Sequence, residues 1–173
     1  MGFIHIYCGD GKGKTTAALG LAIRAAGSGM RVHIVQLLKG NFTSELKIFE
    51  EISNITVERC GKNYGFTFKM SDEDKIQLSK CHNELLLHAE ALMKSGNIDM
   101  LIIDEFNAAY EYNLLDRELA DRIFFEKPNE IELVLTGRRP SEKFIAGADY
   151  VSEIQAVKHP FEKGIAARKG IEF

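Results

Sequence analysis

A glycine-rich segment near the N-terminus carries the residues best suited to chemistry. It reads Gly9-Asp-Gly-Lys-Gly-Lys-Thr-Thr16, after an apolar run and before a helical pattern. The glycines allow a tight turn whose N–H groups can face an anion, and the helix that follows adds the positive end of its dipole. Lys14 adds a charge for phosphate, and the Thr15 hydroxyl can bind a phosphate-bound Mg²⁺ ion. The segment predicts a phosphate-binding loop.

One position departs from the usual phosphate-loop pattern. Four residues normally separate the first glycine from the Gly-Lys pair, which would put glycine at position 8. This chain has Cys8 there, and its first glycine is Gly9. A glycine-rich turn without a ligand is the alternative interpretation. The nucleotide-binding candidates in the segment are Gly9, Asp10, Gly11, Lys12, Gly13, Lys14, Thr15 and Thr16.

Two acids follow an apolar run in the middle of the chain. Asp104 and Glu105 end the sequence Met-Leu-Ile-Ile-Asp-Glu, which has the form of a Walker B segment. A carboxylate at that place can bind magnesium directly or through water. We expect Glu105 to be the main metal ligand beside Thr15, with Asp104 in support. A pair of solvated acids at a strand end is the alternative.

A third apolar run ends in two arginines, Arg138 and Arg139. A guanidinium there can form two hydrogen bonds to a phosphate or to ribose oxygens. A surface pair with an acid is equally open. Arg138 is the nucleotide-binding candidate of the two, and Arg139 is a weaker one.

Two aromatic residues, Phe66 and Phe68, occupy alternate positions in a glycine-bearing segment. In an extended chain they face the same way. Taken alone, they are most simply core residues. Their place between a strand and a capped helix, however, suits exposed aromatics that contact a flat apolar ligand. The five histidines show no metal-ligand spacing, and His5 and His33 lie in strand patterns that favour a structural role.

Strand and helix patterns alternate along the chain. We expect strands at 3–8, 31–38, 55–59, 100–104, 132–136 and 150–157, and helices at 14–26, 44–52, 71–95, 116–126 and 141–146. Such alternation predicts an α/β fold with a mostly parallel sheet and helices on both faces. Ligands bind at the carboxyl ends of the strands in such sheets. The glycine segment, the acid pair and the arginine pair should therefore meet in one crevice.

Composition excludes several classes of function. The chain has 173 residues, a net charge of −3, and no apolar run near the roughly 20 residues of a membrane span. Nucleic acid and membrane are therefore not expected as partners. Three cysteines, Cys8, Cys60 and Cys81, include no C-x-x-C pair and cannot all be bridged within one chain. With no signal-peptide pattern, a reduced cytoplasmic setting is expected.

The sequence resembles the P-loop ATP:cob(I)alamin (corrinoid) adenosyltransferases over nearly its full length. The motifs that carry the resemblance include the glycine segment, Gln36 with Lys39-Gly40, Gly65-Phe-Thr-Phe68, Asp104-Glu105 with Asn107, Leu135-Thr-Gly-Arg138, Ala148-Asp149, Lys158-His-Pro-Phe, and Lys169-Gly-Ile-Glu-Phe173. The resemblance implies a single P-loop NTPase-like (RecA-like) domain over residues 1–173. It also implies transfer of the 5′-deoxyadenosyl group of ATP to Co(I) of a corrinoid, with release of tripolyphosphate.

The resemblance assigns roles to the candidate residues. ATP would lie in the direction opposite to that in ordinary P-loop enzymes, with Lys14, Thr15 and Glu105 as the catalytic set and Mg²⁺, or Mn²⁺ instead, as the cofactor. Phe66 and Phe68 would contact the corrinoid substrate and displace its lower axial ligand. The second aromatic is Phe68 where the family commonly has Trp, and this chain has no Trp.

The resemblance also concerns partners and the cover of the site. It implies a homodimer and an electron donor protein such as a flavodoxin. Some members have an N-terminal extension over the site, whereas this sequence begins at its first predicted strand, so residues 158–173 are one option for a lid. Two other functions stay open on the motifs alone. One is a P-loop kinase or ATPase in which Glu105 positions the attacking group, and the other is a nucleotide-dependent binding module without catalysis.

Overall fold

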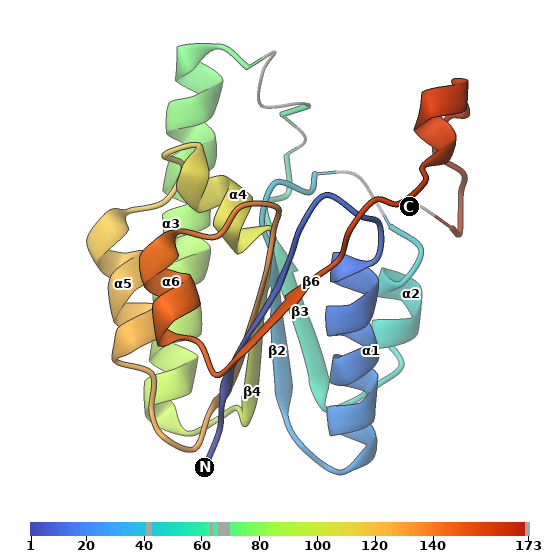
Figure 1. Cartoon of the computed structure of the whole chain (residues 1–173). Helices are drawn as coiled ribbons and strands as arrows, with labels where there is room; N and C mark the ends of the chain where they lie inside the picture. Colours follow the sequence, from blue (N-terminus) through green and yellow to red (C-terminus); the bar gives the residue numbers. More distant parts are fainter. Residues whose placement is uncertain (41–42, 63, 66–69, 172–173) are drawn as a thin grey trace.

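Parallel strands and helices alternate in the computed structural model, which describes residues 1–40, 43–62, 64–65 and 70–171 (Figure 1). The strands are β1 (Ile4–Cys8), β2 (Val32–Gln36), β3 (Ile55–Arg59), β4 (Met100–Asp104), β5 (Glu132–Thr136) and β6 (Tyr150–Glu153). The helices are α1 (Lys14–Gly27), α2 (Leu46–Phe49), α3 (Asp72–Ser95), α4 (Phe106–Glu111), α5 (Arg117–Phe125) and α6 (Glu142–Gly147), followed by the 3₁₀ turn η2 (Pro160–Lys163).

The strands form one six-stranded sheet in the order β3-β2-β4-β5-β1-β6. All five pairings are parallel, so the predicted α/β class is confirmed and the sheet is fully parallel. Strand β5 lies between β4 and β1. The carboxyl ends of these three strands are therefore neighbours, as the sequence predicted for the acid pair, the arginine pair and the glycine segment.

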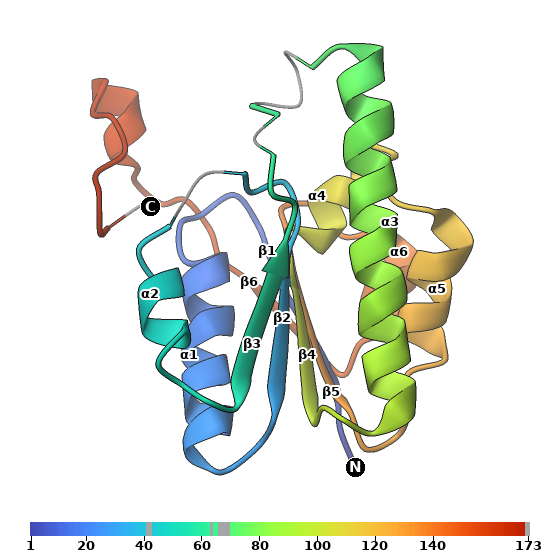
Figure 2. The ribbon, with the colours of Figure 1, turned by 180° about the vertical axis from the view of Figure 1, so that it is seen from behind.

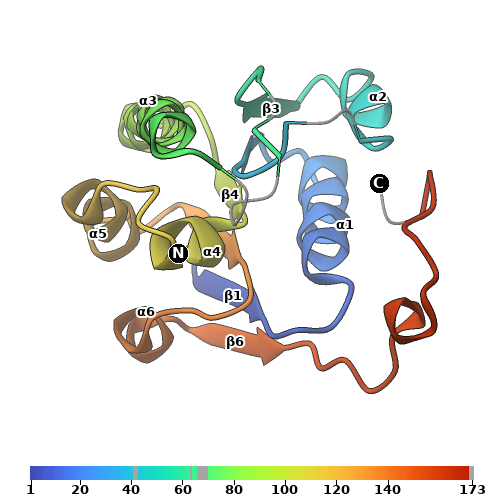
Figure 3. The same ribbon diagram turned by 90° about the horizontal axis from the view of Figure 1, so that it is seen from above.

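Alternate residues of the central strands serve two cores, one on each face of the sheet. Met100 and Ile102 of β4 pack with the buried residues of α1, whereas Leu101 and Ile103 pack with those of α3 to α6. Figure 3 shows α1 and α2 on one side of the sheet and α3, α4, α5 and α6 on the other. Both faces are covered because the connections between parallel strands place helices on them, and most positions of the central strands are therefore apolar.

Helix α3 has the ends that its sequence predicts. The Ser71 hydroxyl accepts a hydrogen bond from the Asp74 N–H and donates one to its carboxylate. Gly96 ends the helix in the left-handed conformation, which glycine adopts without strain. Figure 2 shows this long helix on the side of the sheet away from α1 and α2, where it packs against β2 and β3.

Several boundaries differ from prediction. The predicted last strand 150–157 is wrong in its second half, because β6 ends at Glu153 and the chain then turns toward the glycine segment. The predicted helix 44–52 is reduced to α2. Helix α4 and the turn η2 had not been predicted. Among the described residues, no helix combines the length and apolar character of a membrane span.

The cysteines also differ from expectation. Cys60, just after β3, and Cys81 of α3 form a disulfide, and Cys8 is a buried free thiol. The expectation of reduced cysteines is therefore wrong for this pair. The error has a simple cause: 21 positions separate the two residues, and only the fold brings the end of β3 beside α3.

Candidate functional site

The glycine segment connects β1 to α1 and is held in place by its own backbone. The N–H groups of Gly9 and Gly11 donate to the carbonyls of Arg138, at 3.0 Å, and Ile154, at 2.7 Å. A Cβ atom on Gly11 would lie 2.7 Å from the backbone of Gln155, so only glycine fits there. These two amides are thus committed to neighbouring loops, whereas the sequence had suggested that they face an anion.

The first turn of α1 offers the amides that an anion would use. The N–H groups of Lys14, Thr15 and Thr16 have no acceptor within the helix because they stand at its start. The Lys14 ammonium donates to the Gly11 carbonyl at 2.7 Å. Burial lowers the pKa of Lys14, an effect that the Glu105 carboxylate opposes. A positive charge and a helix start therefore lie together at the end of the loop.

Asp104 is the centre of the hydrogen-bond network at this site. Its side chain is fully buried and accepts hydrogen bonds from Thr15 Oγ1 at 2.9 Å and Thr136 Oγ1 at 2.6 Å. Lys39 Nζ donates to its other oxygen at 2.5 Å and to Thr15 Oγ1 at 3.2 Å. The network joins the ends of β2, β4 and β5 to the first turn of α1.

Glu105 is the second acid of the predicted pair. Its backbone is left-handed, with φ of 62°, and its N–H donates to Thr136 Oγ1 at 2.9 Å. This bond holds a conformation that a residue with a side chain rarely adopts. Burial raises the pKa of Glu105, and the neighbouring Asp104 raises it further. The Glu105 side chain lines two cavities at this edge of the sheet, which are described below.

Lys39 is a site residue that the sequence reasoning did not select. It lies just beyond β2, and its contact with Asp104 exists because β2 and β4 are neighbours. The preceding residue, Leu38, has φ of 57°, and its N–H donates to Nε2 of the buried His82 at 3.2 Å. Burial lowers the pKa of His82 to about 4. The neutral imidazole of α3 therefore helps position the turn that carries Lys39.

Two cavities meet above the start of α1. The larger, of about 690 Å³, runs along the exposed side of α1 toward α2, and the smaller, of about 170 Å³, lies over the glycine segment. Thr15, Thr16, Glu105 and Ile171 line both of them. A volume of several hundred Å³ suits a ligand of nucleotide size. The C-terminal residues Gly170 and Ile171 form part of the wall, on the side of α1 and α2 where Figure 3 shows the C-terminus.

The remaining candidates lie at the edge of this site or outside the described residues. Arg138 is exposed, with Nη1 at 3.9 Å from the carboxylate of Asp10, so these two candidates face each other at the rim. Arg139 instead pairs with Glu111. Phe66 and Phe68 lie outside the described residues. Of the residues on either side of them, Gly65 and Met70 border a small pocket that Lys39 also lines.

The geometry first defines the class. A parallel sheet with a glycine segment after β1, and an acid pair after the strand two places along, is an α/β fold of the P-loop NTPase-like class. The sequence model of the family described as ATP:corrinoid adenosyltransferase BtuR/CobO/CobP matches residues 1–173. The chain therefore belongs to this family of enzymes.

Individual relatives agree with the family match. The corrinoid adenosyltransferase of Escherichia coli (strain K12) is 32% identical over 172 residues, which cover 99% of this chain and 86% of the relative. The corrinoid adenosyltransferase of a Sinorhizobium species is 34% identical over 176 residues, 99% of this chain and 80% of the relative. The corrinoid adenosyltransferase CobA of Salmonella typhimurium is 30% identical over 99% of this chain and 86% of its own length.

Proposed function

We propose that this enzyme transfers the 5′-deoxyadenosyl group of ATP to Co(I) of a corrinoid and releases tripolyphosphate. The cobalt supplies the electron pair for the new Co–C bond, and the C5′–O bond breaks with its pair leaving on tripolyphosphate. No proton moves at the reacting atoms, so the step needs no general base. The protein has to align the two substrates, stabilise charge on the leaving group and exclude water.

The observation that carries this proposal is the meeting of the two cavities over Thr15 and Glu105. The smaller cavity covers the charged end of the glycine segment and suits the triphosphate. The larger has room for the nucleoside on the side of Lys39. That side also leads toward Gly65, the start of the predicted corrinoid-binding segment. We propose that the ribose, rather than the terminal phosphate, faces the corrinoid.

The side chains of the acid pair and Thr15 fit a magnesium ion. One hydroxyl and two carboxylates are the oxygen donors that Mg²⁺ prefers, and Mn²⁺ accepts the same donors. We assign Thr15, Asp104 and Glu105 to hold the ion, which when bound neutralises charge on the triphosphate. Without the ion, Lys39 neutralises Asp104. When ATP is bound, Lys14 and the first-turn amides of α1 contact the phosphate oxygens directly. Arg138 can reach the same phosphate oxygens from the rim of the site.

We propose that Phe66 and Phe68 press against the corrinoid and remove its lower axial ligand. Loss of an axial donor lowers the energy of the cobalt orbital that is filled on reduction, so Co(I) becomes easier to form. Phe68 supplies the apolar surface for this contact without the indole N–H of the Trp common in the family. The aromatic pair therefore acts on reduction, and the glycine segment acts on group transfer.

Further features of the proposal come from the family resemblance. We propose that residues 1–173 act as one catalytic domain, that the enzyme is a cytoplasmic homodimer, and that a donor protein such as a flavodoxin supplies the electron. Light scattering after size exclusion tests the dimer. Reduction of bound Co(II) corrinoid by purified flavodoxin tests the donor.

An anaerobic assay tests the main proposal. Protein, ATP, Mg²⁺ and chemically reduced cobalamin are mixed, and the light-sensitive adenosylated product is followed by its absorbance while phosphorus NMR identifies the inorganic product. We expect one tripolyphosphate per adenosylated corrinoid, with ATP stable when the corrinoid is omitted. Stoichiometric ADP and phosphate would instead indicate the γ-phosphoryl transfer of a kinase or ATPase.

A further inference from the structure

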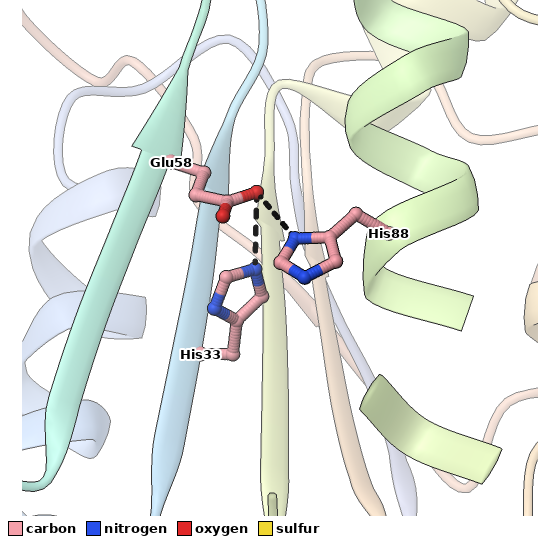
Figure 4. Close-up of side chains that lie close together, drawn as sticks. All are labelled: His33, Glu58 and His88. Carbon is pink, nitrogen blue, oxygen red and sulfur yellow. Dashed lines mark hydrogen bonds and ion pairs between the residues drawn. The ribbon is translucent and has the colours of Figure 1, made fainter. Parts of the chain in front are cut away.

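A second group of ligand-type side chains lies on the opposite face of the sheet from α1. It consists of His33 on β2, Glu58 on β3 and His88 on α3 (Figure 4). Glu58 Oε2 is 2.9 Å from His88 Nδ1 and 3.8 Å from His33 Nε2. The three ligand atoms lie within 4.8 Å of one another, although the residues come from three separate elements.

Thr56 on the neighbouring strand β3 contacts one nitrogen of the His33 imidazole. The Thr56 hydroxyl lies 3.4 Å from the Val32 carbonyl, to which it can donate, and 2.8 Å from His33 Nδ1. When the hydroxyl donates to Val32 it accepts from Nδ1, and in that tautomer Nε2 of the neutral ring presents a lone pair toward Glu58.

This lone pair has no partner within the described residues. The His33 side chain is almost completely buried, and no hydrogen bond reaches its Nε2 atom. The Glu58 carboxylate lies 3.8 Å away and is itself an acceptor. In the tautomer with the hydrogen on Nδ1, two acceptors face each other at 3.8 Å, which is unfavourable unless a cation lies between them. Figure 4 shows Nε2 of His33 and Nδ1 of His88 both directed at the same Glu58 oxygen.

We propose that His33 Nε2, His88 Nδ1 and Glu58 form a binding site for a divalent transition metal of the Zn²⁺ class. Two imidazoles and one carboxylate are a common donor set for such ions, and a fourth position remains for water or another ligand. The hydrogen bond from His33 Nδ1 to Thr56 would orient the ring and fix its tautomer, as second partners of metal-bound histidines generally do. The magnesium site of the proposed function uses other residues on the other face of the sheet.

Closing the site on an ion needs little movement. Metal–nitrogen distances near 2.1 Å require ligand atoms no more than about 4 Å apart. The His88 side chain is half exposed on the surface of α3, so its rotation can bring the imidazole in. The other two proposed ligands, His33 and Glu58, already lie on neighbouring strands of the sheet.

The elements that this metal would connect are those on either side of residues 60–71. Strand β3 leads into that stretch and α3 follows it, and Cys60–Cys81 already links the same two elements. A metal on His33, Glu58 and His88 would add a second link and stabilise the framework that holds the stretch with Phe66 and Phe68. Its primary effect is therefore on stability.

Zinc titration without nucleotide or corrinoid tests the site. Isothermal calorimetry is run with Zn²⁺ in excess Mg²⁺, which occupies oxygen-ligand sites. We expect one Zn²⁺ per chain and a rise in melting temperature on binding. The variants His88→Ala and Glu58→Gln should each weaken binding by at least about tenfold. His5→Ala removes the histidine of another His–Glu pair, with Glu132, and should leave binding unchanged.

Nitrogen NMR of the histidine rings supplies a measurement that does not depend on variants. Without metal, His33 should be neutral with its hydrogen on Nδ1, and Zn²⁺ should shift the Nε2 signals of His33 and the Nδ1 signals of His88. The proposal is overturned if Zn²⁺ binds more weakly than about 1 mM. It is equally overturned if binding survives both ligand variants, or if His33 at neutral pH carries hydrogens on both nitrogens as an ion-pair partner of Glu58.

Discussion

Asp104 and His33 are both buried polar side chains on neighbouring strands, yet they differ in how many hydrogen-bond partners surround them. Asp104 accepts hydrogen bonds from Thr15, Lys39 and Thr136. Within the described part of the chain, the His33 side chain has one hydrogen bond, to Thr56, and its other nitrogen faces the Glu58 carboxylate. The buried carboxylate is satisfied within the chain, so any ligand of Asp104 competes with Lys39. Nε2 of His33 has no such competitor among the residues that the structure describes.

The regions around these two residues differ in the same way. The carboxyl ends of β1, β4 and β5 carry the charged groups of the proposed reaction. These strand ends are the first region. The second region consists of β2, β3 and α3, which are connected to one another by the disulfide, by His82 and by the cluster of His33, Glu58 and His88. We therefore expect variants of the first region to lose activity while they stay folded, and variants of the second region to lose stability.

The largest effect is expected from Lys14→Ala. The ammonium stands at the start of α1 beside Glu105, and loss of a group that stabilises charge in the transition state commonly lowers kcat by about 10²- to 10³-fold. The melting temperature should stay near that of the wild type. Steady-state rates with chemically supplied Co(I) provide the measurement. Lys75→Ala, an exposed lysine on α3, is the control. Activity of Lys14→Ala within a fewfold of the wild type would contradict the proposed role.

A pH titration tests the second region through His82. The pKa of this residue is about 4 in the folded protein, against an ordinary value of 6.5. Between these values the unfolded chain binds more protons, so the free energy of unfolding falls as the pH drops from 6.5 to 4. The loss from this group amounts to as much as about 3 kcal/mol. Urea denaturation should show a shallower pH dependence for His82→Gln, and an unchanged slope would refute the assignment.

The disulfide makes the second region sensitive to reductant. A link between residues 21 positions apart restricts the unfolded chain and contributes about 3 kcal/mol to stability. We expect Cys81→Ser, or treatment of the wild type with dithiothreitol, to lower the free energy of unfolding by that order. Cys8→Ser should keep the response to reductant. Three titratable thiols in the denatured, unreduced protein would show that the link is absent in solution.

Phe68→Ala is expected to have the smallest effect and to act on one assay only. With Co(II) corrinoid and an enzymatic reductant, we expect about a tenfold loss of rate, which corresponds to about 1.4 kcal/mol. With Co(I) supplied chemically, the rate should change little, because reduction is no longer required. Phe125→Ala, an exposed phenylalanine of α5, is the matched control. Equal losses in both assays would indicate a purely structural ring.

The sequence predicted the features that depend on neighbouring residues. The glycine segment, the acid pair after an apolar strand and the Ser71 cap are local patterns, and the structure has each of them where it was expected. Alternating strands and helices were enough to predict the parallel sheet. Local patterns also predicted that three strand ends would meet, because parallel strands place their ends at one edge.

The features that were missed depend on strand order or on backbone conformation. Lys39 reaches Asp104 only because β2 pairs with β4, and His33, Glu58 and His88 meet only in the folded chain. Helix α4 begins directly after Glu105, whose backbone is left-handed. The sequence has no glycine at this position that would have indicated such a turn. These contacts join residues tens of positions apart, so periodicity could not reveal them.

A crystal structure of the protein with ATP and Mg²⁺, in the absence of corrinoid, tests the central claim most directly. We expect the triphosphate over Lys14, Thr15 and Thr16, with ribose C5′ directed toward the side of the site that Lys39 and Gly65 share. The opposite arrangement, with the γ-phosphate directed toward Gly65 and the ribose turned away, would contradict the account.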